Sequence, residues 1–183
     1  GKPMRTPAKA ILVVPTRALA EAIAAEWAAV PEKAELNAAH LPLTRLAATG
    51  IDRVVSRREE VIADTAKYAG SDLLCYRATA PESLVGLQRE RWDPLLAWAA
   101  ERHAARLVTA DGIGFVAQGA AARARLHEAV AAHGDLALSA LYNLTHIAGS
   151  VVIALAVSDG RLDAAGAFTA AQILTTLAAM ENW

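Results

Sequence analysis

The chain has 183 residues, enough for one hydrophobic core or for two small domains that share an interface. Its 18 basic and 19 acidic residues leave a net charge of −1, which argues against nucleic acid or an anionic membrane as its partner. A single cysteine, Cys75, excludes an intrachain disulfide and favours a reducing compartment. Hydrophobic residues make up 55% of the chain and Ala supplies many of them, so we expect a largely helical protein.

The N-terminal part of the chain combines one expected strand with one expected helix. Ala10–Val14 is short, β-branched and followed by Pro15, which is typical of a strand that ends in a turn. After Thr16, a favourable N-cap residue, apolar residues recur at three- and four-residue spacing and predict a helix over Arg17–Val30. The polar segment Pro31–Leu41 predicts a loop.

Helices are expected to follow one another from Pro42 onward. Apolar residues on one face predict a helix over 42–51 that Pro42 begins. Ser56 has a Glu three residues later, which is a capping-box pattern and predicts a second helix over Arg57–Ala69 that ends at Gly70. The short apolar run Leu73–Tyr76 is either a strand or an extended core segment.

The clearest amphipathic helix is expected over Pro81–His103. Pro94 lies inside it and should kink the helix or split it in two. Beyond it, Asp111-Gly112 separates two alternating apolar runs, which predicts a β-hairpin near 106–117.

The C-terminal third of the chain predicts three further helices. The first covers Ala120–Ala132. Leu136–Ser158 carries no formal charge over 23 residues, the length of a membrane span, but its Ser, Asn, Thr and His side chains are costly in lipid. We interpret it instead as a central helix that its neighbours surround, so we do not expect an integral membrane protein. Asp163 should cap the last helix, over Ala164–Trp183.

Motifs for catalysis or cofactor binding are missing from the sequence. It has no phosphate-binding loop, and Gly112-Ile113-Gly114 lacks the third glycine of a dinucleotide fingerprint. No histidine lies four residues from another, so the spacing does not indicate zinc. We therefore expect no catalytic residues, no metal and no cofactor.

One catalytic alternative stays open. Cys75 as a nucleophile and His146 as a base, with Arg77 beside them, would line the pocket of a helical enzyme or small-molecule-binding protein. The competing interpretation is an inert buried thiol and a histidine that belongs to the core.

The densest cluster of charged and aromatic residues is the run RERWD at 89–93. Trp and Arg dominate the hot spots of protein interfaces, which makes Arg89, Glu90 and Trp92 candidate partner-binding residues. The alternative is an ordinary amphipathic helix whose Arg stems cover apolar surface.

Three stretches of the chain together resemble one protein family. They read PMRTPAKAILVVPTRALAEAIAAEWAA, LPLTRLAATGIDRV and SDLLCYRATAPESLVGLQRERWDPLLAWA, and the later HIAGSVVIALAVSDGRLDAAGAF also fits the family pattern. The chain is similar to the assembly chaperones of the F-type ATP synthase catalytic head, a mitochondrial and alphaproteobacterial family that binds the alpha subunit. The high Ala content suggests a bacterial member.

The resemblance implies an α+β fold that is mostly α. A small β-rich N-terminal domain at 1–41, with further residues expected upstream of it, would precede a larger multi-helical domain at 42–183. It also implies a chaperone that is not an enzyme. Such a chaperone binds the free alpha subunit and shields its beta-subunit interface until assembly. For this chain we expect a monomer in the bacterial cytoplasm, whereas eukaryotic relatives would lie in the mitochondrial matrix.

The last helix departs from the family pattern. Relatives usually carry acidic residues there, where this chain has Ile173–Leu177, and only Met180–Trp183 matches the family ending. Glu181 and Trp183 therefore join Arg89, Glu90 and Trp92 as the expected partner-binding residues.

Overall fold

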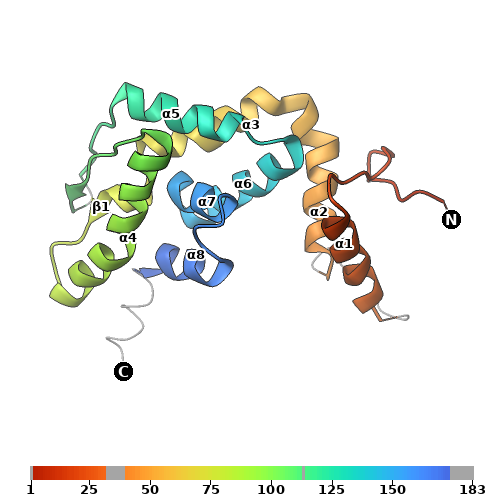
Figure 1. The fold of residues 1–183 in the computed structure, drawn as a ribbon, viewed down its shortest axis with the longest axis horizontal. Coiled ribbons are helices and arrows are strands. Elements are labelled where there is room, and N and C mark those ends of the chain that lie inside the picture. The colour runs from red at the N-terminus through yellow and green to blue at the C-terminus, as the bar shows by residue number, and fades with distance from the viewer. Residues whose placement is uncertain (1, 32–39, 113, 174–183) are drawn as a thin grey trace. The chain divides into compact units, whose positions relative to one another are not determined.

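The computed structural model describes residues 2–31, 40–112 and 114–173, and helices dominate them (Figure 1). The chain divides into two compact units. The first comprises Gly1–Val61 and Gly134–Ala140, and the second comprises Ile62–His133 and Leu141–Trp183. The predominance of helix confirms the α-rich character that the Ala content predicts.

The first unit contains the helix expected after Thr16. This helix, α1, spans Arg17–Ala29, and the Thr16 Oγ1 accepts a hydrogen bond from the Leu19 N–H at 3.2 Å, which confirms the predicted cap. The next helix, α2, spans Pro42–Thr49 and has its proline in the first turn, where the missing N–H costs nothing.

The helical path continues beyond α2 without a break. A wide turn over Gly50–Val54 and a tight turn over Val55–Arg57 lead into α3, which spans Arg58–Ala66, and a tight turn over Lys67–Gly70 ends the path. The predicted end at Gly70 is therefore confirmed, and α3 begins one residue after the predicted start, but the predicted cap at Ser56 is wrong.

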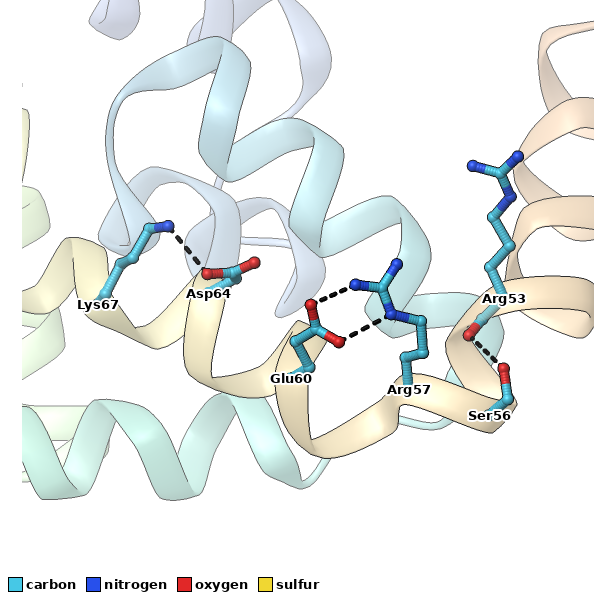
Figure 2. Close-up of polar contacts among 6 residues, drawn as sticks. All are labelled: Arg53, Ser56, Arg57, Glu60, Asp64 and Lys67. Carbon is cyan, nitrogen blue, oxygen red and sulfur yellow. Dashed lines mark hydrogen bonds and ion pairs between the residues drawn. The ribbon is translucent and has the colours of Figure 1, made fainter.

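Ser56 does not cap a helix. Its hydroxyl donates a hydrogen bond to the Arg53 carbonyl at 3.1 Å, as Figure 2 shows. A serine inside a helical path can satisfy its hydroxyl in this way, so the Ser-to-Glu spacing is no sufficient sign of a helix start. Next to the predicted capping-box residue Glu59, the Glu60 carboxylate pairs with the Arg57 guanidinium (Figure 2).

Gly50 permits close packing against the first turn of α6, which spans Asp135–Ala148. A Cβ atom at this position would lie 2.6 Å from the Leu136 Cδ2 and 3.1 Å from the Leu136 Cα. The Arg58 guanidinium pairs with the Asp135 carboxylate at 2.7 Å beside this approach. These contacts join the two chain segments of the first unit.

The β-rich N-terminal domain expected over 1–41 is not supported. Among the described residues there, pairing is limited to one antiparallel bridge between Arg5 and Ile11, and Ala10–Val14 forms no strand. The segment folds into a tight turn on itself, in which the Leu12 N–H donates to the Met4 carbonyl at 2.9 Å. β-branched residues favour a strand only where a neighbouring strand pairs with them, and the described segment has none beyond this bridge.

The second unit contains a small parallel strand pair. After a tight turn over Leu73–Cys75, β1 at Tyr76–Arg77 pairs in parallel with β2 at Ala110–Asp111. The hairpin predicted over 106–117 is therefore corrected: the described strand partner of β2 is β1, far away in sequence. Local turn chemistry cannot reveal such a distant partner.

The long helix predicted after Pro81 is confirmed. This helix, α4, spans Glu82–His103 and runs through Pro94, so the proline does not split it. Trp92 and Leu95 on either side are buried, and their packing holds the two turns together despite the missing N–H at the proline.

The core of the second unit is built around α7. This helix spans Val151–Ser158 and contacts α4, α5 (Ala120–Ala131) and α8 (Ala164–Ala171). Six consecutive residues, Val151–Ala156, are fully buried, as expected of a central helix. No helix in the described parts of the chain is both long and apolar enough to cross a membrane.

The single helix predicted over 136–158 is wrong. The apolar stretch divides into α6 and α7 at Gly149, whose φ of +67° favours glycine, and the Ser150 Oγ accepts a hydrogen bond from the Ile153 N–H at 3.0 Å. Asp163 caps α8 as predicted, since its Oδ1 accepts from the Gly166 N–H at 2.7 Å. The remainder of the predicted last helix, at 174–183, lies outside the described residues.

Candidate partner-binding surface

A buried carboxylate fixes the segment that leads into α4. Asp72 is fully buried, its Oδ1 accepts from the Leu74 N–H at 3.1 Å, and its Oδ2 accepts from the Val152 N–H at 3.2 Å. The Ser150 side chain bonds to the same carboxyl group. Burial raises the pKa of Asp72 to about 6, and these hydrogen bonds oppose the rise. Asp72 thus ties the 72–77 segment to the N-terminus of α7.

Arg77, five residues later, orients α4. Its Nε donates to the Leu74 carbonyl at 2.9 Å, its Nη1 donates to the Gln88 carbonyl at 3.3 Å, and its Nη2 pairs with the Asp93 carboxylate at 2.7 Å. The guanidinium carbon lies 5.4 Å from the centre of the Trp92 ring, within range of a cation–π contact. Because these contacts hold one face of α4, they determine which of its residues face outward.

Trp92 belongs to the core, which corrects its assignment to a partner-binding surface. Its relative exposure is 0%, and its Nε1–H donates to the Ala170 carbonyl of α8 at 2.8 Å. A tryptophan that is buried and hydrogen-bonded inside its own chain contributes packing energy and offers no surface to a partner. The sequence cluster combined a buried position of the helix with exposed ones.

The outward face of α4 carries the charged members of the cluster. Arg89 and Glu90 are exposed, and the Glu90 carboxylate lies 3.3 Å from the Arg91 Nε. Within the described parts of the chain, no ion pair or hydrogen bond of the Arg89 guanidinium is found, so this cation is available to a partner. Glu181 and Trp183, the other predicted contact residues, lie outside the described residues.

The alternative site around Cys75 lacks the chemistry of a nucleophile. Cys75 is fully buried, and burial, together with the nearby Asp72 carboxyl, raises the pKa of its thiol to about 12, so the reactive thiolate does not form near neutral pH. His146 is exposed, and its Nδ1 donates to the Tyr142 carbonyl at 2.8 Å. The imidazole packs against the Tyr142 and Tyr68 rings, with ring centres 4.0 and 5.0 Å apart. The Arg77 guanidinium instead contacts the Gln88 carbonyl and the Asp93 carboxylate of α4.

Other charged residues on the surface form local pairs. The Lys67 ammonium and the Asp64 carboxylate lie 2.9 Å apart at the end of α3, and Figure 2 shows this pair beside the one formed by Arg57 and Glu60. Exposed pairs of this kind contribute little to stability, typically below about 1 kcal/mol. They do change which charges are available to a partner.

Comparison with known proteins identifies the family. The profile of the ATP12 chaperone protein family matches residues 1–100. The crystal structure of Atp12 from Paracoccus denitrificans is similar over 100% of this chain and 77% of its own, with 42% sequence identity and a TM-score of 0.91. The Atu1473 protein from Agrobacterium tumefaciens is similar over 100% of this chain and 68% of its own, with 38% identity and a TM-score of 0.91.

Sequence and structure lead to the same family. Its profile matches more than half of the chain, and the similarity to the two bacterial structures extends over the whole of it. The resemblance noted in the sequence is thereby confirmed, and the chain belongs to the ATP12 chaperone family.

Proposed function

We propose that this protein binds the free alpha subunit of the F-type ATP synthase and covers its beta-subunit interface until the beta subunit replaces it. Membership of the ATP12 chaperone family is the observation that carries this proposal. A subunit without its partner exposes apolar surface and tends to aggregate, and a chaperone that covers this surface prevents the aggregation. The protein acts by binding alone, without catalysis and without a cofactor.

The proposed contact surface includes the outward face of α4, with Arg89 and Glu90, and the C-terminal residues Glu181 and Trp183. Exposed apolar side chains of the second unit supply the apolar part of such a surface. They are Val108, Phe115, Ile147 and Phe168. An interface that combines a few charged residues with isolated apolar anchors suits a partner that must later be released.

The organisation of the active protein is part of the proposal. We propose a monomer in the bacterial cytoplasm. Limited proteolysis with identification of the fragments tests the predicted division into 1–41 and 42–183, because a linker between independent domains is cut before the domains themselves. Light scattering after gel filtration measures the molar mass and so tests whether the protein is a monomer.

Co-expression with the alpha subunit in the absence of the beta subunit tests the function. The proposal expects a complex of chaperone and alpha subunit that survives gel filtration, and less alpha subunit in aggregates than without the chaperone. A chaperone that is folded by circular dichroism, yet forms no complex and leaves aggregation unchanged, would disprove the function.

A further inference from the structure

We infer that a groove along one face of α5 binds an acidic segment of the client protein. The groove consists of two adjoining hollows, one of about 430 Å³ and one of about 330 Å³, which share Arg123 as a lining residue. This inference rests on the proposed function, because it names the part of the alpha subunit that one surface of the chaperone holds.

The geometry of α5 produces the first hollow. Ala120, Arg123, Ala124 and His127 follow one another at three- and four-residue spacing, so they share a single face of the helix. Opposite them lie Ala63, Ala66 and Lys67, at the end of α3 and in the turn that follows, against which α5 packs (Figure 1). Alanine has the smallest side chain after glycine, and the four alanines therefore leave room in this hollow for a segment of another protein. The face from Ala120 to His127 is about 10 Å long.

The charged residues that line the groove are of one sign. No lining residue of either hollow is acidic, while Lys67, Arg123 and His127 supply basic groups. The Lys67 ammonium is paired with Asp64 at 2.9 Å. In the described part of the chain, no ion pair or hydrogen bond of the Arg123 guanidinium is found.

Arg125 on the same helix makes the contrast clear. It pairs with Glu128 at 2.9 Å and lines neither hollow. The free cation of this helix is therefore the one that points into the groove, where it can bind a carboxylate of the client in a bidentate manner.

The second hollow adds an apolar contact. Phe115 lines it and is 76% exposed, a large aromatic side chain left in water by its own chain. The wall beside it is fixed, because the buried Gln118 amide accepts from the Val108 N–H and donates to the Val108 carbonyl, both at 2.8 Å. A rigid wall with an exposed ring lowers the entropy cost of binding.

These features together define the occupant. It is a protein segment that carries a carboxylate for Arg123 and, a short distance along, an apolar side chain for Phe115. Nucleic acid fits less well, since the protein has a net charge of −1 and the groove offers one exposed aromatic ring for stacking.

Charge reversal with a matched control on the same helix tests the inference. The full chain is titrated with the alpha subunit, and binding of wild type, Arg123→Glu and Arg125→Glu is compared at low and high salt. We expect Arg123→Glu to weaken binding at least tenfold and to flatten its salt dependence, while Arg125→Glu stays within about twofold of wild type, because only Arg123 faces the groove. If Arg123→Glu loses helicity, Arg123→Gln replaces it and should weaken binding at least threefold.

The possible results separate the two proposals. If wild type binds the alpha subunit and both variants bind equally well or equally poorly, the groove inference is overturned and the proposed function stands. If wild type itself fails to bind the alpha subunit, the proposed function is overturned, and the groove inference with it.

Discussion

The buried carboxyl group of Asp72 makes stability depend on pH in a direction that the structure fixes. Burial raises the pKa of Asp72 from 3.8 to about 6, so the folded state holds this proton more tightly than the unfolded state. The protonated Asp72 contributes its full stabilisation at a pH below the pKa that it has in the unfolded state. This contribution is lost as the pH rises through the pKa that it has in the folded state. The relevant window therefore runs from about pH 4 to about pH 6.

The size of the effect follows from the shift. A difference of about two pKa units corresponds to about 3 kcal/mol, with a maximal slope of about 1.4 kcal/mol per pH unit. Asp72→Asn resembles the protonated acid at every pH, because its amide oxygen accepts from one backbone N–H while its amino group can only donate. The free energy of unfolding of wild type relative to Asp72→Asn should thus increase by up to about 3 kcal/mol between pH 7 and pH 4.

Urea denaturation of both proteins across this pH range measures the difference. At each pH, the unfolding free energy of Asp72→Asn is subtracted from that of wild type. This removes the contribution of all other titrating groups, provided that these behave alike in the two proteins. If this difference stays constant with pH, or grows toward high pH, burial does not dominate the pKa of Asp72.

Three further substitutions and one control substitution test the packing within each unit. Glu26→Gln should cost about 1 kcal/mol in unfolding free energy at pH 7, because the Glu26 carboxylate accepts the Leu43 N–H at the start of α2 at 2.6 Å. Burial acts to raise the pKa of Glu26, but its hydrogen bonds lower it on balance, so this stabilisation should vanish as pH falls below 4.5 and through the lowered folded pKa. Gly50→Ala should destabilise by about 1–3 kcal/mol in thermal denaturation, because its Cβ would lie 3.1 Å from the Leu136 Cα. Gly86→Ala is its control, since nothing lies within 4 Å of that Cβ, and it should be neutral or stabilise by up to about 1 kcal/mol. Trp92→Phe should cost about 2 kcal/mol, because it removes a buried hydrogen bond and leaves a void; a melting temperature equal to wild type would contradict the buried role.

Helix ends were predictable where a single local bond decides them. Thr16 and Asp163 each accept a backbone N–H three residues later, and both caps follow from residue type and spacing alone. Ser56 has the same chemistry but lies in a helical path that packing continues, so its hydroxyl turns back to a carbonyl. Local preference is therefore a guide that tertiary contacts can override.

The remaining differences concern partners that are distant in sequence. The pairing of β2 with β1 joins Ala110 to Tyr76, and no periodicity in either segment specifies it. The division between α6 and α7 at Gly149 was hidden because both helices are apolar. Hydrophobic content alone does not distinguish one long central helix from two shorter ones.

The candidate contact residues show the same limit. Arg89, Glu90 and Trp92 are close together in sequence, but Trp92 is buried in the core whereas Arg89 and Glu90 are exposed. The groove of α5 was not predicted, since its lining comes from segments that are separate in sequence: the end of α3 with the turn after it, the loop before α5, and α5 itself. The sequence did contain one sign of the groove: the spacing of Ala120, Arg123, Ala124 and His127 places small and basic residues on one face of a helix.

Displacement by the beta subunit shows whether this protein covers the beta-subunit interface of the alpha subunit. The purified complex of this protein with the alpha subunit is mixed with the beta subunit and followed by gel filtration. We expect the alpha subunit to leave the chaperone and join the beta subunit, while the chaperone elutes free. A chaperone that remains on the alpha subunit together with bound beta subunit would contradict the claim that it covers the beta-subunit interface.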